Sequence, residues 1–477
     1  MTTAARPHVP ARAGLRHTAR RLLLSIRNPI EALPAEVHTA PILHSRLLHR
    51  TLVHVMDPAL IQSALAGHAA ALDKGETVRR PLTPALGEGL LTAEGAHWRW
   101  QRQALAPVFR PDRVQALLTP MIAAAERARD RLLAAREPVP IDREMMRATF
   151  EVILDTMLPG GEAFDAEQMA QGVTDYVRQT NWSLVSVMLG LPEWTPHPGK
   201  RRALRAVRNM RAQINRHVVA RRAGLHPTRT APDLLDQLLA AADPETGRAM
   251  TDADVTDNLL TFLTAGHETT ALSLAWTLDL LARHALIADR AAAEVQAITG
   301  GRPLRPEHVA RLNYIRCVVQ EGMRLYPPVP MIARTVRSGF ELGGTALQPG
   351  TVLVVPINAV HRHAALWQEP ECFDPDRFGP EGSEGRHRYA FMPFGAGPRV
   401  CIGNGFAMLE ATAILAVLLG ALRFTPALHR PPRARMDLTL RPETPLLLSV
   451  STAPSSSPGG PPATRSSSPH PPPGTYR

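Results

Sequence analysis

A proline-free stretch of about thirty residues with helical periodicity runs through residues 252–283. Thr251 and Asp254 precede and open it in a pattern close to the capping box that begins many helices. A globular helix of this length usually crosses the whole molecule. Gly266 lies in its middle, where glycine costs about 1 kcal/mol relative to alanine. The stretch therefore predicts a central helix in which something offsets the cost of that glycine.

Helical periodicity dominates the rest of the chain as well, and strand signals are few. Further helices are predicted at residues 113–135, 141–158, 199–222, 312–326 and 404–420. Short strands, bounded by Pro and Gly, are predicted at residues 47–55, 333–342 and 351–355. The expected fold class is mostly α with a small β-sheet region.

The 477 residues suffice for one very large domain or for two to three ordinary ones. No internal repeat or Gly/Ser linker divides residues 31–452, so a single large domain is the simpler interpretation. Residues 1–30 are predicted to form a basic, poorly patterned arm. Residues 453–477 consist almost entirely of Pro, Ser, Gly, Thr and Ala, and we expect this tail to be disordered.

The formal net charge of +11 is concentrated at the two ends of the chain. Six arginines precede the first acid, Glu31, and the tail adds Arg465 and Arg477, so the body between them is near neutral. A basic arm can touch RNA, an anionic membrane or an acidic protein, but no nucleic-acid recognition motif accompanies it. We therefore expect no nucleic-acid partner.

The cysteines and the hydropathy of the first thirty residues indicate the cellular compartment in which the protein is expected. Cys317, Cys372 and Cys401 cannot form a disulfide framework and lack the close pairs of a zinc or iron–sulfur site, which implies a reducing compartment. The early apolar run at residues 22–26 is too short to cross a bilayer, so we expect no transmembrane anchor. The Arg-rich, acid-free start also resembles a mitochondrial presequence, although a cytoplasmic location is favoured.

Residues 394–403 read Phe-Gly-Ala-Gly-Pro-Arg-Val-Cys-Ile-Gly and lead directly into an apolar, alanine-rich helix. Such a loop delivers a thiol to a helix N-terminus, where free N–H groups favour the thiolate. A lone cysteine is usually only a small buried hydrophobe. In this loop, however, the thiolate would be a soft, electron-rich ligand for iron.

Phe394, Gly397, Arg399, Cys401 and Gly403 match all the fixed positions of the haem-binding signature of cytochromes P450, and the chain resembles that family. The resemblance implies the cytochrome P450 fold, haem b as cofactor and Cys401 as the axial ligand of the iron. It also implies that Phe394 shields the sulfur, that Arg399 binds a haem propionate, and that Gly403 lets the next helix pack closely on the macrocycle.

Residues 265–270 read Ala-Gly-His-Glu-Thr-Thr inside the long helix. On its own, such a segment is usually a packing site with solvated polar neighbours. It resembles the oxygen-binding motif of the same family, which implies that Ala265 and Gly266 leave room for dioxygen. Oxygen activation needs protons delivered into a dry pocket, and Glu268 and Thr269 are the candidate acid and alcohol.

Glu321 and Arg324 are three residues apart, a spacing most often found in minor surface salt bridges. They match the family's E-x-x-R motif, and residues 373–378 match its aromatic-Pro-acid-Arg-Phe segment. The resemblance implies that Glu321, Arg324 and Arg377 form a buried three-way network with a structural role.

Haem propionates are anions, which guanidinium and indole donors bind well. Trp98 and Arg102, four residues apart, match the family's W-x-x-x-R element, and His97 is expected to assist. Arg334 follows the Pro-rich segment at a position where the family often has another propionate arginine. For Arg334 an exposed strand position is an equally open alternative.

The resemblance implies a monooxygenase that inserts one oxygen atom of O2 into a small hydrophobic substrate. The chain shows no flavin-binding domain, so electrons are expected from a separate ferredoxin-type or flavodoxin-type donor with its reductase. A haem-thiolate sensor is the alternative, against which the acid–alcohol pair argues because a sensor needs no proton delivery. Substrate contacts are predicted in four places: residues 82–91, residues 176–189, Phe262, and Met331 with Ile332.

Overall fold

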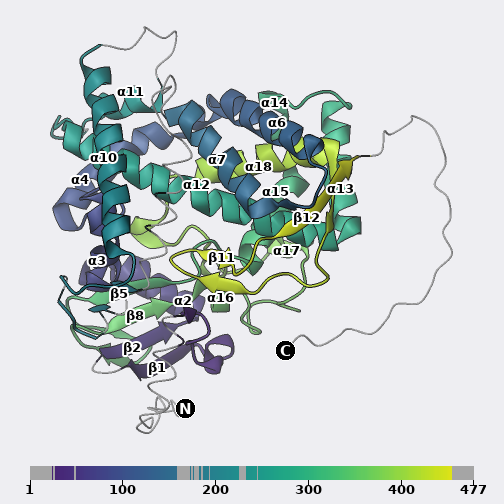
Figure 1. Ribbon diagram of the computed structural model, residues 1–477. Coiled ribbons are helices and arrows are strands. Elements are labelled where there is room, and N and C mark those ends of the chain that lie inside the picture. Colours follow the sequence, from purple (N-terminus) through teal and green to yellow (C-terminus); the bar gives the residue numbers. More distant parts are fainter. Residues whose placement is uncertain are drawn as a thin grey trace.

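A computed structural model describes residues 24, 27–47, 50–157, 172, 176, 182–183, 186–187, 189–192, 194–224, 233–243 and 245–453. Helices fill most of the molecule, and a five-stranded sheet lies at one end of it (Figure 1). The mostly α fold with a small β-sheet region is therefore confirmed.

The helices that carry the architecture differ widely in length, from single turns to the long α12. Their bounds are α2 Pro58–Gln62, α3 Gly75–Leu86, α4 Gly95–Leu105, α5 Pro111–Gln115, α6 Leu118–Ala134, α7 Ile141–Met157, α10 Lys200–Arg222, α11 Leu234–Leu239, α12 Asp252–Arg283, α13 Ala285–Thr299, α14 Pro306–Val309, α15 Asn313–Leu325, α16 Ile357–Val360, α17 Pro380–Ser383 and α18 Asn404–Ala421.

Helix α12 begins and ends where the sequence predicts. The hydroxyl of Thr251 accepts a hydrogen bond from the Asp254 N–H, and the Asp254 carboxylate accepts one from the Thr251 N–H, which completes the capping box. The helix runs through the middle of the helical part (Figure 1), with α7, α10 and α15 packed against it. Because it is covered on nearly all sides, α12 is the axis on which the other helices are placed.

Within the part of the chain that the structure describes, the strands form four small sheets. Their bounds are β1 Ile42–Leu47, β2 Arg50–Val55, β3 Leu72–Asp73, β4 Val139–Pro140, β5 Ile332–Val336, β6 Phe340–Leu342, β7 Thr345–Leu347, β8 Val352–Val355, β9 Leu422–Pro426, β10 Ala434–Met436, β11 Leu440–Pro442 and β12 Leu447–Thr452. The largest sheet has the order β1-β2-β8-β5-β3, and only its β2–β8 pairing is parallel. Strands β4, β12 and β9 form a second sheet, and the β10–β11 and β6–β7 hairpins form the others.

Three of the predicted elements are wrong in detail. The helix expected at 113–135 is two helices, α5 and α6, because Pro120 lacks the N–H that would bond to the carbonyl of Ala116. The strand expected at 47–55 begins later, as β2 from Arg50, and Leu47 is the last residue of β1, which pairs antiparallel with β2 from Ile42 opposite Val55 onward. The strand expected at 333–342 is divided into β5 and β6 by a bend at residues 337–338.

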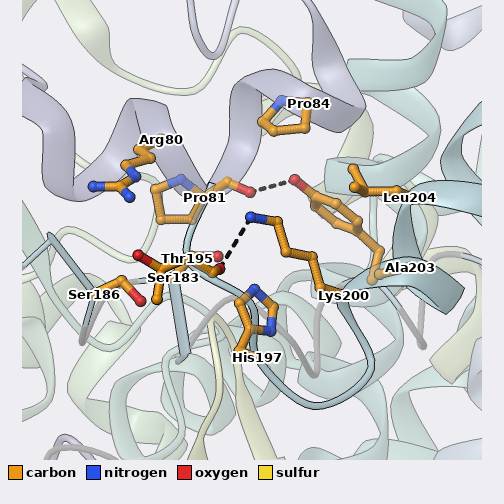
Figure 2. Close-up of a pocket in the computed structure, with 11 residues that line it drawn as sticks. Arg80, Pro81, Pro84, Ser183, Ser186, Thr195, His197, Lys200, Ala203 and Leu204 are labelled. Atoms are coloured by element: carbon orange, nitrogen blue, oxygen red, sulfur yellow. Dashed lines mark hydrogen bonds between the residues drawn. The ribbon is translucent and has the colours of Figure 1, made fainter. Parts of the chain in front are cut away.

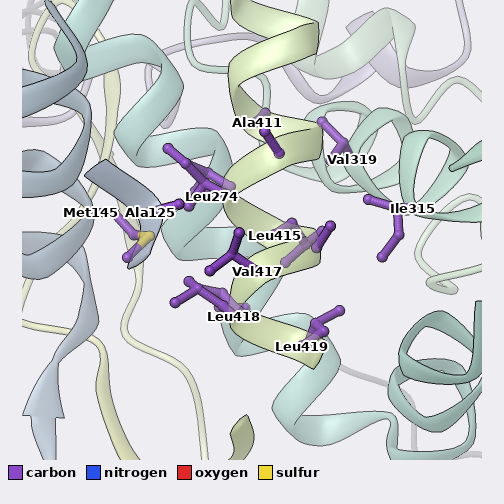
Figure 3. Close-up of a cluster of buried hydrophobic side chains, with 14 of the residues drawn as sticks. Ala125, Met145, Leu274, Ile315, Val319, Ala411, Leu415, Val417, Leu418 and Leu419 are labelled. Carbon is purple, nitrogen blue, oxygen red and sulfur yellow. The ribbon is translucent and has the colours of Figure 1, made fainter. Parts of the chain in front are cut away.

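The largest hydrophobic core surrounds α18. Figure 3 shows Leu274 of α12 on one side of α18, with Ala125 of α6 and Met145 of α7 beyond it, and Val319 and Ile315 of α15 on the other side. By length and composition, α18 is the one helix of the described residues apolar enough to cross a membrane, or one of two if the bent pair α12–α13 counts as a span. Most of α18 is buried inside the protein, as expected for a core helix.

Candidate active site: the cysteine cavity

The sulfur of Cys401 faces a cavity of about 560 Å³, which we call the cysteine cavity. It lies between α12, α3, α4, β5 and the loop that precedes α18, and its lining is mostly apolar. Most of the residues predicted to form the site line it: Trp98, Arg102, Ala265, Gly266, Glu268, Thr269, Arg334, Phe394, Arg399, Cys401 and Gly403. The fold thus brings together residues that are far apart in the sequence. Arg399, for example, contacts Glu94, which lies 305 positions earlier beside the cavity residue Trp98.

The loop before α18 fixes the position of Cys401. The Cys401 N–H donates to the Phe394 carbonyl at 2.9 Å, which closes the loop. Burial raises the pKa of the Cys401 thiol, while the Gly403 N–H and the charge of Arg102 lower it. Burial is the largest of these effects, and the Gly403 N–H at the start of α18 acts in the direction that the sequence predicts, toward the thiolate. A cation bound at the sulfur would supply the missing stabilisation of the thiolate.

Gly397 is required by the backbone of this loop. Its φ is +69°, and a Cβ atom added there would lie 2.1 Å from the carbonyl oxygen of Leu65. Any other residue would combine strained backbone with a collision against another main-chain segment. Gly397 does not line the cysteine cavity, so it acts by shaping the loop.

Helix α12 forms the wall of the cavity that carries Ala265 and Gly266. A Cβ atom at Gly266 would lie 3.2 Å from Cδ1 of Ile153 on α7, so glycine permits close packing of the two helices. This contact accounts for part of the cost of a glycine in mid-helix. One turn along, the hydroxyl of Thr269 donates to the Ala265 carbonyl at 2.6 Å.

Glu268 lines the same wall but is held by groups that the sequence did not indicate. Its side chain is 2% exposed, and Oε1 accepts from Nε of Arg441 at 2.7 Å and from the hydroxyl of Thr439. Both partners lie in the β10–β11 hairpin. The Leu440 carbonyl of this hairpin also accepts a hydrogen bond from the indole N–H of Trp276. No pattern near Glu268 could have revealed them, because they lie more than 170 residues away.

A group of cations, which we call the cation cluster, lines one flank of the cavity and consists of Lys74, Arg102, Arg334 and Arg399. Arg399 donates to the Ala93 carbonyl at 2.8 Å, contacts the Glu94 carboxylate and lies 3.9 Å from the ring centre of Trp98. Burial is the largest cause that lowers the pKa of each of the four, and Glu94 counters it at Lys74, Arg334 and Arg399.

Lys74 was missed by sequence reasoning, since a lone lysine is usually exposed. Here it is buried, and its ammonium donates to the Leu91 carbonyl. Burial, followed by repulsion from Arg399 and Arg334, lowers the pKa of Lys74 well below its usual value. Positive charge is therefore in excess over the nearby carboxylates at this flank, which fits an anionic ligand such as the two propionates of haem.

His97 does not line the cysteine cavity. Its Nε2 lies 2.6 Å from the side-chain nitrogen of Gln101, and its ring packs near Trp100. Neighbouring residues on a helix point about 100° apart, so His97 faces away from the direction taken by Trp98. The assistance to a propionate that the sequence suggested for His97 has no support in this geometry.

Glu321, Arg324 and Arg377 meet in a buried network apart from the cavity. The Arg324 guanidinium donates to both oxygens of Glu321, at 2.6 and 2.7 Å, and Arg377 approaches Glu321 at 3.5 Å. Arg324 also donates to three carbonyls, those of His361, Pro370 and Cys372. The arginine thereby ties α15 to the segment that leads toward the cysteine loop.

The remaining lining is apolar. Of the predicted substrate contacts, Phe262, Met331 and Ile332 line the cavity, together with Leu82, Leu86, Leu90 and Leu91 from the 82–91 segment. Most of residues 176–189 lie outside the described residues.

A second pocket of about 60 Å³ lies at α3 and the start of α10 (Figure 2). Arg80, His197 and Lys200 line it, and Lys200 donates to the Thr195 carbonyl at 3.2 Å (Figure 2). Pro81 lines both this pocket and the cysteine cavity. The second pocket has room for only a few small groups and contains no cysteine, so the cysteine cavity is the candidate active site.

Comparison with known proteins identifies the class to which this fold and site belong. A sequence profile of the family "Cytochrome P450" matches residues 24–450. The crystal structure of the cytochrome P450DA haem domain superposes with a TM-score of 0.76 at 27% identity, covering 87% of this chain and 90% of that one.

Comparison with curated protein sequences gives the same family. The chain is 33% identical to cyclooctatin synthase of Streptomyces melanosporofaciens over 91% of this chain and 94% of the relative. It is 32% identical to cyclooctat-9-en-7-ol 5-monooxygenase of the same organism, over 77% and 79% of the two chains. It is also 32% identical to human cytochrome P450 4F12, over 82% and 79%.

The chain belongs to the cytochrome P450 family. It is a haem monooxygenase that acts on hydrophobic substrates, and its cofactor is haem b. The cysteine cavity fits that cofactor, because a thiol, the small residues Ala265 and Gly266 and an excess of partly or fully buried cations all line it.

Proposed function

We propose that this enzyme inserts one oxygen atom of O2 into a small hydrophobic molecule bound in the cysteine cavity, with electrons from a separate ferredoxin-type or flavodoxin-type donor and its reductase. The observation that supports this most strongly is that Cys401 and the small residues Ala265 and Gly266 line one and the same largely apolar cavity. An apolar lining favours a substrate that gains by leaving water. We further propose a cytoplasmic location, as the cysteine usage suggests.

The residues of the cavity divide into three tasks. Cys401 would bind the haem iron as a thiolate, and Phe394, whose carbonyl accepts from the Cys401 N–H, would shield the sulfur from water. Arg102, Arg334, Arg399 and the indole of Trp98 would hold the propionates. Bound haem supplies the redox chemistry that activates dioxygen.

Glu268 and Thr269 handle protons on the substrate side. The Thr269 hydroxyl donates to the Ala265 carbonyl, and its lone pairs are left to accept a hydrogen bond from the cavity. Glu268 precedes Thr269 in the chain. Its carboxylate accepts hydrogen bonds from Arg441 and Thr439, which keep it at the cavity wall. Glu321, Arg324 and Arg377 position the proximal segment and take no part in the chemistry.

Substrate-linked oxygen uptake tests the proposal. The purified enzyme with ferredoxin, reductase and reduced nicotinamide cofactor is screened against hydrophobic compounds that shift its Soret band. We expect at least one compound to raise oxygen consumption and to yield an equal amount of a product heavier by one oxygen atom. Binding of gases and ligands without any stimulated oxygen consumption would indicate the alternative, a haem-thiolate sensor.

A further inference from the structure

Arg50 is a cation of the cysteine cavity that the roles proposed so far leave unused. It is the first residue of β2, and it lines the cavity together with Leu52 and His54 of the same strand. Alternate residues of a strand point to the same face of a sheet. Val53, which lies between them, is buried in the core on the other face. The side chain of Arg50 therefore belongs to the sheet face that forms a wall of the cavity.

The charge of Arg50 is not balanced within the described residues. There its guanidinium contacts the Val187 carbonyl, which accepts a hydrogen bond from Nη2 at 3.3 Å. The Nε atom of Arg50 is buried and has no hydrogen-bond partner among the same residues. A neutral carbonyl does not cancel a positive charge, and a buried donor without a partner is costly. An anion with two oxygens would satisfy both the charge and the donor.

Arg50 lies apart from the cation cluster, so the haem propionates do not account for it. Strands β2, β8 and β5 lie side by side (Figure 1), and His54, Val354 and Ala333 form one row across them. Arg334 of the cation cluster follows Ala333 on β5. Arg50 precedes the His54 of that row by four residues, which corresponds to about 13 Å along the strand. It is also two strands away from β5.

The opposite end of this sheet face lies next to the loop that carries Cys401. Ile332, the first residue of β5, occupies the row just beyond Ala333 and lines the cavity. A Cβ atom added at Gly395 of the loop would lie 3.5 Å from Cδ1 of Ile332. The side chains that line the cavity between the two ends of the face are mostly apolar. The face thus has a cation at one end and the cysteine loop at the other.

We propose that Arg50 binds the anionic end of the substrate, and that the substrate is an apolar molecule carrying a carboxylate. The two oxygens of a carboxylate match the planar fork of a guanidinium, in which Nε and a second N–H donate side by side. The apolar remainder occupies the cavity between Arg50 and the cysteine loop, where it gains by leaving water. Oxygen is then inserted at a carbon remote from the acid group. This inference rests on the proposed oxygen-inserting function.

Binding of matched acids and esters tests the site in the haem-loaded enzyme without any turnover. The probes are a long-chain fatty acid and a diterpene carboxylic acid, each compared with its own methyl ester. Equilibrium dialysis gives the dissociation constants. We expect the unaltered enzyme to bind at least one acid about tenfold to hundredfold more tightly than its ester, as hydrogen bonds to a charged group allow.

Three variants show whether Arg50 is the source of this preference. Arg50→Gln keeps a donor but removes the charge, so the preference for the acid should disappear while the affinity for the ester stays unchanged. Arg50→Lys keeps the charge without the fork and should keep part of the preference. The control is Arg46→Gln, because Arg46 lies on the neighbouring strand β1, is exposed and does not line the cavity. We expect this control to bind both probes as the unaltered enzyme does.

The position of oxidation gives a second readout. A fatty acid held at Arg50 has the far end of its chain beside the cysteine loop. The unaltered enzyme should therefore oxidise the half of the chain remote from the carboxylate, and Arg50→Gln should give products spread along the chain. An unchanged product pattern in Arg50→Gln would contradict the placement of the acid group.

Three binding results would overturn the proposal. The unaltered enzyme could prefer neither acid to its ester, or Arg50→Gln could keep the preference. Equal loss of affinity for acid and ester in Arg50→Gln would show that Arg50 only holds the segment at Val187 in place. Failure of the proposed function gives a different result, in which the acids bind with the expected dependence on Arg50 but no oxidised product forms.

Discussion

Two buried groups of charge, the Glu321 network and the cation cluster, differ in how their charge is neutralised. In the network, Arg324 and Glu321 are both fully buried, and every nitrogen of the guanidinium has an oxygen partner within the protein. In the cation cluster, the partners that the described residues offer Lys74 and Arg334 are main-chain carbonyls, and burial lowers the pKa of both.

The comparison shows which part of the molecule is complete without a ligand. The network is balanced by the polypeptide, so removing one member leaves a buried charge alone. The four cations of the cation cluster exceed the charge of Glu94, and an anion in the cavity would balance the remainder. Changes in the network should therefore affect folding, and changes in the cation cluster should affect retention of haem.

The largest effect is expected from Arg324→Ala. This change leaves Glu321 as a buried carboxylate without its main partner, and such losses cost about 3–5 kcal/mol of unfolding free energy. Denaturant unfolding measures the change. The control is Arg110→Ala, because Arg110 and Asp112 form an exposed ion pair whose loss should cost less than about 1 kcal/mol. Equal losses of unfolding free energy in the two variants would contradict the claim that the buried pair stabilises the protein more than the exposed pair does.

Arg334→Gln should give a smaller effect of a different kind. A hydrogen bond to a charged group contributes about 1.5–3 kcal/mol, which corresponds to a haem affinity lower by about tenfold to a hundredfold. Transfer of haem to an excess of a haem-scavenging apoprotein measures this. Arg337→Gln is the matched control, since Arg337 lies just beyond the same strand and is exposed outside the cavity. Similar release rates for both variants would contradict a propionate role for Arg334.

Lys74 should give the smallest effect, visible as pH dependence. Without an anion its pKa lies well below the usual lysine value, and a propionate beside it would raise that pKa. Haem binding then takes up a proton, so haem affinity should fall as pH rises from the lowered pKa toward the usual one. We expect haem release to quicken steadily over this range, because the protonated ammonium that attracts the propionate is lost. If haem release from Lys74→Met depended on pH as it does in the unaltered enzyme, Lys74 would not be the group that takes up the proton.

Local patterns predicted the helices well because their information lies within a few turns. Thr251 and Asp254 gave the start of α12 to the residue, and the apolar run after Gly403 gave α18. The strand predictions were poorer because short strands such as β10 and β11 owe their existence to pairing with each other rather than to alternation. The β4–β12–β9 sheet was missed for the same reason.

The sequence predicted those residues of the candidate site that belong to a local motif. It did not predict the residues that only the fold brings to the site. Cys401 and Arg399 stand in a fixed local pattern, and the structure places both at the cavity. Arg441 and Lys74 reach the site from distant segments with no neighbouring signal.

The central claim is that the Cys401 thiolate binds the haem iron in the cysteine cavity. The carbon monoxide difference spectrum of the reduced protein tests it most directly, measured on the unaltered enzyme and on Cys401→Ala. We expect a strongly red-shifted Soret band in the unaltered enzyme and its absence in the variant, because that shift depends on sulfur ligation. Retention of the red-shifted band after loss of this sulfur would contradict the claim.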